Sequence, residues 1–290
     1  MLLTGAGGFV GAAIVQHLQN ADLELVACDL FGAARDLNVL DKNAVEKLML
    51  EVQPTAVIHA AAITTDDNDL DLLEVNVRGT LHVLDAAKKS GVEHLVLFSS
   101  SGVYTALNEV VIEVSPTSSA SAYALSKLLA EEICTVGKNS SLTVWLLRLG
   151  PIYGAGEHAS PTRTKTSIIH QIAQAILQQK PVLLPRAATD IYNWLHTQDL
   201  ARLLELIVAR ADDGGVHLFN VAGAPISGHE LVAIFQALVP EIDLQTLLEW
   251  TATPPPRHGA MDCSHIQQEL GWQPHVPLQT GILEYLKVKP

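Results

Sequence analysis

Short apolar runs alternate along the first 150 residues with longer segments whose apolar residues recur at helical spacing. The apolar runs are 1–3, 23–27, 56–59, 95–98 and 143–147, and the amphipathic segments between and after them are 12–18, 42–52, 70–89 and 122–136. The later runs are near-continuous in apolar residues, which is typical of strands buried on both faces. The pattern predicts an α/β fold with a doubly wound parallel sheet. The first strand is unusually short, so we expect a minimal or truncated N-terminus.

The pattern changes after Gly150. A loop rich in Pro, Thr, Ser and His covers 151–166, a helix is expected over 167–178, and prolines bound the segment 181–185. Residues 200–210 and 216–221 predict a helix and a strand that return to the sheet, and three prolines at 254–256 precede a last helix over 264–270. We therefore predict a sheet domain over 1–150 and about 195–222. A smaller, discontinuous lobe would comprise about 151–194 and 223–290.

Composition narrows the function classes. The chain has 290 residues, 48% of them apolar, enough for a large core. Its net charge is −13 with no basic run, so nucleic acid is a poor candidate partner and a nucleotide would be held by backbone amides and a few local cations. We expect a cytoplasmic protein with no membrane partner, because no apolar run approaches the ~20 residues of a membrane span. The three cysteines are far apart, which predicts buried, reduced thiols and no metal site.

A glycine-rich turn, TGAGGFVG at 4–11, follows the first apolar run. Glycines lack the Cβ that would block the approach of a pyrophosphate to the N–H groups that open a helix. The residues expected to bind a dinucleotide there are Gly5, Gly7, Gly8, Phe9, Val10 and Gly11. Glycines alone also fit a tight strand-to-helix turn, so a second signal is needed to choose.

Tyr123 and Lys127 provide that signal, because they lie one helical turn apart on a predicted helix. The ammonium, together with an oxidised nicotinamide, would lower a tyrosine pKa that is ordinarily ~10. The phenolate could then take the proton of a substrate hydroxyl while a hydride moves to the nicotinamide, so both residues would serve catalysis and cofactor binding. The cofactor is therefore expected to be NAD, bound by a Rossmann domain, with the smaller lobe holding substrate.

Other candidates lie where strands end. Asp29 would bind the adenosine ribose and repel a 2′-phosphate, or merely cap a turn; nearby Arg35 leaves NADP open. Asp36 and Leu37 would border the adenine or form a solvated turn. At the carboxyl ends of later strands, Ala60, Ala61 and Ala62 would let the backbone approach the cofactor, and a hydroxyl of Ser99 to Ser101 would hold the reacting oxygen. We expect His59 to be packed rather than a base, and Asn76 to brace the site or lie on a helix surface.

Seven motifs extend the picture: TGAGGFVG, HAAA (59–62), NVRGT (76–80), FSSSGVY (98–104), YALSK (123–127), RLGPIYG (148–154) and ELGWQP (269–274). With them the chain resembles an extended short-chain dehydrogenase/reductase of the NAD-dependent epimerase/dehydratase family. The resemblance implies that Ser100 is the catalytic hydroxyl, counting back from Tyr104, although counting forward from Phe98 gives Ser101. It also places Ser99 and Pro151 with the cofactor, and Ser101, Gly102 and Tyr153 with the substrate. Helices 70–89 and 122–136 would form a homodimer seam.

The departures from the family pattern concern the substrate. Ser101 and Gly102 stand where dehydratases of the family have an Asp-Glu pair, which disfavours loss of water. Tyr192 stands where many epimerases have a pyrophosphate-binding arginine, whereas Arg257 matches a second family arginine. In the loop 157–167, Arg163, Lys165 and His158 would meet an anionic group or face water. The short stretch from Asp29 to Pro54 and the phrase NWLHTQDLARLL are similar to members that oxidise free sugars or sugar acids.

Two functions follow. The first is NAD-dependent epimerisation of a carbinol in a sugar-like substrate, in the manner of a UDP-sugar 4-epimerase; the alternative is net dehydrogenation of a free sugar or sugar acid. An epimerase must retain NADH, whereas a dehydrogenase must release it each turnover. A non-catalytic NAD-sensing regulator would keep the glycines but would have no use for Tyr123 and Lys127.

Overall fold

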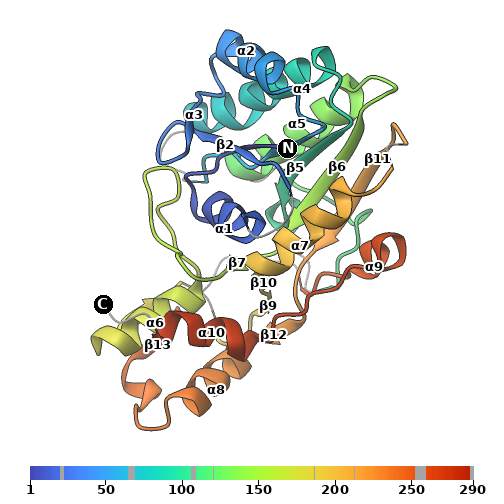
Figure 1. The fold of residues 1–290 in the computed structure, drawn as a ribbon. Helices are drawn as coiled ribbons and strands as arrows, with labels where there is room; N and C mark the ends of the chain where they lie inside the picture. Colours follow the sequence, from blue (N-terminus) through green and yellow to red (C-terminus); the bar gives the residue numbers. More distant parts are fainter. Residues whose placement is uncertain are drawn as a thin grey trace.

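A seven-stranded parallel sheet forms the larger lobe of the computed structural model, as predicted (Figure 1). The structure describes residues 1–19, 23–64, 69–105, 109–119, 121–185, 187–211, 213–251 and 259–287. The strand order is β11-β6-β5-β4-β1-β2-β3. The strands are β1 (Leu2–Thr4), β2 (Val26–Asp29), β3 (Arg35–Asp36), β4 (Ala56–His59), β5 (His94–Ser100), β6 (Thr143–Leu149) and β11 (Val216–Val221).

Helices cover both faces of this sheet (Figure 1). The first face carries α1 (Phe9–Leu18) and α7 (Thr197–Val208), and the second carries α2 (Lys42–Val52), α4 (Gly79–Lys89) and α5 (Ala122–Gly137). Side chains of a strand alternate between faces. Accordingly Val96 and Phe98 of β5 pack beneath α1 and α7, whereas Leu95 and Leu97 pack beneath the other three helices.

The helix predicted over 70–89 is present but is not one continuous α-helix. It consists of α3 (Asp69–Leu73), a π-helical turn η1 (Glu74–Arg78) and α4. The buried side chain of Asn76 lies within the π turn and bonds to two neighbouring segments. Such wide turns are frequent at functional sites, and apolar spacing does not reveal them.

The second lobe has its own apolar core, which includes Ile169, Ile172, Leu231 and Phe235. Its elements are α6 (Ile168–Gln178), β8 (Val182–Leu184), β9 (Ile191–Asn193), β12 (Pro225–Ser227), α8 (Gly228–Leu238), η3 (Leu244–Thr246), β13 (Leu248–Trp250) and α10 (Leu278–Lys287). The pair of β7 (Ile152–Tyr153) with β10 (Leu195–His196) joins the lobes, because Leu195 packs into the core of the sheet lobe and Tyr153 into that of the second. The helix α9 (Ser264–Leu270) departs from the predicted division. Ile266 and the following Trp272 pack into the core of the sheet lobe, because α9 lies against β11.

The structure also bears on the predictions about cysteines, membrane spans and metal sites. Cys28 and Cys134 are buried free thiols, as predicted, whereas Cys263 is partly exposed. Burial raises the pKa of each of these thiols to about 12. Within the described ranges, no helix has the length and apolar character needed to cross a membrane. The same part of the chain contains no cluster of three His, Cys, Asp or Glu side chains suited to a metal ion.

Candidate functional site

The turn between β1 and α1 requires its glycines. Gly5 has φ of +76°, and a Cβ there would lie 2.4 Å from the backbone nitrogen of Ala61. A Cβ on Gly11 would lie 2.1 Å from the carbonyl oxygen of Gly5, and one on Gly7 would lie 1.9 Å from that of Phe31. Gly8 is the N-cap residue of α1, and it has no side chain that could accept from the first N–H groups of the helix. The turn is therefore a glycine cradle that presents backbone rather than side chains at Gly5, Gly7, Gly8 and Gly11 and ends at a helix N-terminus, so it fits a pyrophosphate.

The structure brings Asp29 to this turn. One carboxylate oxygen accepts a hydrogen bond from the Gly7 N–H at 2.8 Å, and the other accepts one from the Leu30 N–H at 2.6 Å. The capping bonds are thus present, and the carboxylate also lies at the end of β2 beside the cradle. Arg35, the residue that left NADP open, is in an ion pair with Glu51 at 2.6 Å.

The two residues expected at the adenine lie differently. Asp36 is exposed, whereas Leu37 is buried in the core beneath α2 and α4. The side chain of Leu37 therefore offers no surface to an adenine. Its backbone N–H donates to the Asp29 carbonyl at 2.7 Å, which fixes the loop after β2.

Asp29→Ala should lower the selectivity for NAD over NADP by about tenfold or more, because the group that repels the added phosphate is removed. The ratio of the two dissociation constants measures this effect. Asp85→Ala is the control and should leave the ratio unchanged, because this carboxylate pairs with Lys42 of α2 at 3.6 Å. If Asp29→Ala leaves the ratio unchanged, Asp29 only caps the turn and does not select between the two coenzymes.

The helix α5 places Tyr123 and Lys127 at the carboxyl edge of the sheet. Ser121 caps the helix by accepting from the Ala124 N–H at 3.1 Å, which puts Tyr123 in its first turn. The buried Lys127 ammonium lies 5.8 Å from the Tyr123 ring centroid and donates to the Phe98 carbonyl at 2.9 Å. Burial lowers the pKa of Lys127 to about 8, and the Glu131 carboxylate opposes part of that shift. The ammonium is thus held close to the phenol by the end of β5.

The serines at the end of β5 differ in their surroundings. The Ser100 hydroxyl accepts from the Gly102 N–H at 3.0 Å, at the start of the 3₁₀ turn η2 (Ser101–Val103). A Cβ on Gly102 would lie 3.3 Å from the Ser100 oxygen and 3.8 Å from the Tyr123 ring. Ser101 is buried. The geometry therefore favours Ser100 over Ser101 as the hydroxyl beside Tyr123.

Ser99 points to the other face of the sheet and donates to the Glu131 carboxylate. Glu131 is also held by Arg148 through two bonds, from Nε at 3.0 Å and from Nη2 at 2.7 Å. All three residues are buried. The Ser99 hydroxyl, assigned from sequence to the cofactor, therefore belongs to a charged network behind the site. Sequence reasoning missed Glu131, although it follows Lys127 by one helical turn.

Asn76 braces the site. Its side-chain oxygen accepts from the Ile63 N–H at 2.8 Å, and its amide nitrogen donates to the Ser126 hydroxyl at 3.0 Å. Ser126 in turn donates to the Tyr123 carbonyl at 2.8 Å. This chain of bonds ties the loop after β4 to the first turn of α5.

His59 is packed, as predicted. Its ring nitrogens lie 2.7 Å from the Thr4 hydroxyl and 3.1 Å from the Thr80 hydroxyl. Burial, with a smaller contribution from the Lys127 charge, lowers the pKa of His59 to about 3. The imidazole is therefore neutral at physiological pH and is occupied on both sides.

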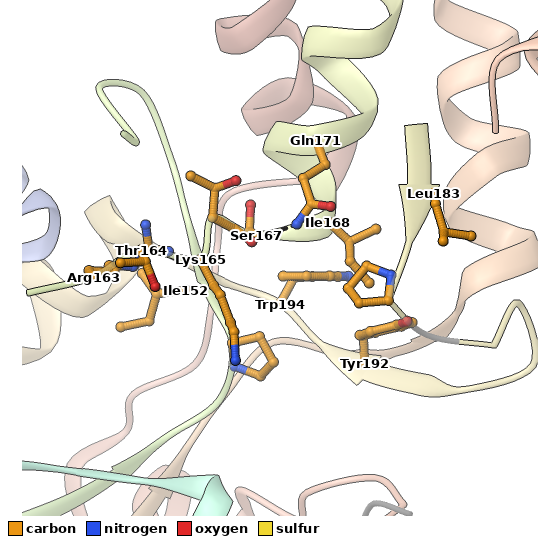
Figure 2. Close-up of a pocket in the computed structure, with 13 residues that line it drawn as sticks. Ile152, Arg163, Thr164, Lys165, Ser167, Ile168, Gln171, Leu183, Tyr192 and Trp194 are labelled. Carbon is orange, nitrogen blue, oxygen red and sulfur yellow. Dashed lines mark hydrogen bonds between the residues drawn. The ribbon is translucent and has the colours of Figure 1, made fainter. Parts of the chain in front are cut away.

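A pocket of about 670 Å³ opens in the second lobe (Figure 2). Its lining comprises Pro151, Ile152, Arg163, Thr164, Lys165, Thr166, Ser167, Ile168, Gln171, Leu183, Pro185, Tyr192 and Trp194. One lining residue, Pro151, lies two residues beyond Leu149, which is the partner of Ser100 in the sheet register. One wall is aromatic: the Tyr192 and Trp194 rings stack with centroids 5.2 Å apart.

Polar side chains form another part of the lining, from Arg163 to Ser167 and at Gln171. Lys165 extends from the loop beside Trp194, and Gln171 approaches from α6 (Figure 2). The Trp194 Nε1–H is buried and has no hydrogen-bond partner within the described residues. Lys165 is among the loop residues that we expect from sequence to meet an anionic group or to face water, whereas Trp194 is not assigned to the substrate from sequence. Trp194 could have been suspected from its place in the segment 192–194 that departs from the family pattern.

The predicted substrate residues are distributed unevenly. Tyr192 lines the pocket, and Gly102 lies beside Ser100 and Tyr123. Arg163 also lines the pocket, but its guanidinium is paired with Glu157 at 2.6 Å. Arg257 lies outside the described residues.

Tyr153 departs from the prediction that it contacts substrate. It is 1% exposed and packs against Trp194 and His196 in the core of the second lobe. Its hydroxyl lies close to Gly281 of α10, where a Cβ would be 2.8 Å from the phenol oxygen. The ring therefore serves packing between β7 and α10.

Comparison with known proteins adds independent evidence. Residues 1–222 match the NAD dependent epimerase/dehydratase family. A UDP-glucose 4-epimerase of Azospirillum brasilense is 26% identical, over 98% of this chain and 89% of the relative. A probable dTDP-glucose 4,6-dehydratase of Sinorhizobium fredii is 25% identical, over 97% and 90%. The structure of MoeE5 in complex with UDP-glucose and NAD is similar with a TM-score of 0.85, at 25% identity over 99% of this chain and 97% of that one.

Proposed function

Because the chain belongs to the NAD-dependent epimerase/dehydratase family, we propose that it oxidises a carbinol of a nucleotide sugar in the manner of a UDP-sugar 4-epimerase. It is an NAD-dependent enzyme of the extended short-chain dehydrogenase/reductase type. The observation that carries the substrate class is the pocket. Its volume of about 670 Å³ and its stacked aromatic wall suit a nucleotide with its sugar, and a lone monosaccharide would leave much of it empty.

The residues at the sheet edge divide the chemistry between them. NAD, when bound, supplies an acceptor for the hydride of the substrate carbinol. Tyr123 takes the hydroxyl proton as the hydride leaves, and Lys127 stabilises the phenolate. The Ser100 hydroxyl holds the reacting oxygen. In an epimerase the resulting ketone rotates within the site, so that the hydride returns to its opposite face. Tyr123 then gives the proton back to the oxygen.

Loss of water is the less fitting reaction, although dehydratases are among the relatives. It needs an acid and a base beside the sugar, and the two residues after Ser100 are Ser101 and Gly102. The nearby carboxylate of Glu131 faces away from the site and is held by Arg148 and Ser99. It is therefore not placed to serve as either group.

Net dehydrogenation of a free sugar or sugar acid is the second candidate. Lys165 in the pocket could pair with a sugar carboxylate as well as with a pyrophosphate. A screen separates the two functions: interconversion of UDP-sugars without added coenzyme, alongside NAD reduction by free sugars and sugar acids. Epimerisation predicts UDP-sugar turnover and coenzyme that copurifies. NADH accumulation with a free sugar would favour the dehydrogenase instead.

We also propose a homodimer formed through α4 and α5. Leu81, Leu129 and Val136 on these helices are large apolar side chains exposed at 41%, 39% and 81%. A second copy of the same seam would cover them and exclude water from all three. Sedimentation at micromolar concentration should show a dimer, and a stable monomer would refute the proposal.

A further inference from the structure

The loop between β7 and α6 contacts the sheet lobe as well as the second lobe. Its residues 155–166, here called the strap, extend from the second lobe toward the sheet lobe beside α1 (Figure 1). The Thr162 carbonyl accepts from the Thr64 N–H at 2.8 Å and from its hydroxyl at 3.2 Å. The Arg163 guanidinium lies over the Phe9 ring, 5.0 Å from its centroid. The strap therefore touches the sheet lobe at two points.

These two points flank the crevice at the centre of the sheet. Thr64 follows β4 and Phe9 follows β1, and these strands are neighbours. The chain proceeds from β1 to β2 and β3 on one side and returns to β4 on the other, so the strand order reverses between β1 and β4. Ligands of open α/β sheets bind in the crevice at such a switch point. The glycine cradle at Gly5 to Gly11 lies there, and the strap crosses it.

A single buried carboxylate holds the strap. Glu157 accepts from Arg163 Nη2, from the Ser167 N–H, from the Ser167 hydroxyl and from the Tyr285 hydroxyl, each at 2.6 Å. Its side chain is fully buried. These partners belong to the strap, to the start of α6 and to α10. Glu157 thus fixes the strap to the second lobe and fixes the direction in which Arg163 points.

We propose that Glu157 is a positioning residue for the coenzyme: it holds the strap across the crevice, so that NADH leaves slowly. The idea rests on the proposed function, because slow release matters for an enzyme that must return its hydride. For NADH to leave, the strap must separate from Thr64 and Phe9, and the bonds of Glu157 resist that movement. Removing them should speed release without touching Tyr123, Lys127 or the cradle.

The test is the rate of NADH release, measured by displacement with excess NAD in a stopped-flow fluorimeter with no substrate present. Glu157→Gln removes the negative charge that pairs with Arg163 and leaves one acceptor oxygen where the carboxylate has two, so two of the four bonds are lost or must reverse direction. We expect release at least about tenfold faster. Arg163→Met leaves the Glu157 bonds to Ser167 and Tyr285 in place but removes the contact with Phe9. It should speed release in the same direction, and it decides the question if Glu157→Gln does not fold.

Glu230→Gln is the matched control. This exposed carboxylate also accepts bonds from a serine in the second lobe, Ser227, but lies at the start of α8. The rate of NADH release from Glu230→Gln should equal that from the wild type. NADH binding with release rates within twofold of wild type in Arg163→Met and in folded Glu157→Gln would overturn the strap proposal alone. Failure of the wild type to bind NADH would instead overturn the proposed function.

Discussion

Tyr123→Phe should lower turnover by more than ~10²-fold while leaving the dissociation constant of NAD nearly unchanged. The substitution removes the phenol oxygen that, when ionised, accepts the substrate proton, and it keeps the aromatic ring in the first turn of α5. Lys127→Met should act likewise, because the phenol then loses the cation that stabilises its ionised form. Ser100→Ala should cost more turnover than Ser101→Ala, since the Ser100 hydroxyl and the Tyr123 ring both lie next to Gly102.

Tyr153→Phe is the matched control for this prediction. It removes a phenol hydroxyl from a buried ring that packs in the second lobe. The turnover of Tyr153→Phe should stay within about tenfold of the wild type. The comparison requires that Tyr123→Phe and Tyr153→Phe both fold and bind NAD normally. A loss of less than ~10²-fold in Tyr123→Phe would contradict the base role. A larger loss in Ser101→Ala than in Ser100→Ala would reassign the hydroxyl.

The largest effect on stability is expected from Arg148→Met. Arg148 and Glu131 form a bidentate pair with both side chains buried, and the substitution leaves the carboxylate without its counter-charge. Removing one member of a buried pair typically costs about 3–5 kcal/mol of the free energy of unfolding. Urea denaturation measures that loss. The double variant Arg148→Met/Glu131→Leu should recover part of it, because the unpaired carboxylate is then removed as well.

Arg35→Met is the control for the ion pair. Arg35 also pairs with a glutamate at 2.6 Å, but both partners are half-exposed, so the urea midpoint should not move. An Arg148→Met midpoint equal to that of the wild type would mean that water reaches Glu131. The network behind Ser99 would then have no part in holding the end of β5.

The sheet lobe could be predicted from sequence because its strands are near-continuous apolar runs and its helices carry periodic apolar faces. The helix over 42–52 and the strand over 216–221 have the predicted bounds. The π turn at Asn76 could not be foreseen, since it follows from bonds to Ile63 and Ser126, which are distant in sequence. In the second lobe, pairs such as β8 with β13 are too short to show a period.

The site divides in the same way. Tyr123, Lys127, Ser100 and the glycines sit in local motifs whose spacing is itself the signal. Glu157 has no such motif, because one of its partners, Tyr285, is 128 residues away. Arg163 was expected to meet an anionic group or water, and its pairing with a buried carboxylate in its own loop depends on the folded shape of that loop.

The fate of the carbinol hydrogen tests the central claim most directly. The substrate identified by the screen would be deuterated at its reacting carbon and mixed with an excess of enzyme and NAD, then quenched within one turnover. Mass spectrometry should find the deuterium on the coenzyme or back on the sugar, with none in water, and Tyr123→Phe should leave it on the substrate. Deuterium released into water would show proton abstraction without hydride transfer, and would contradict the account.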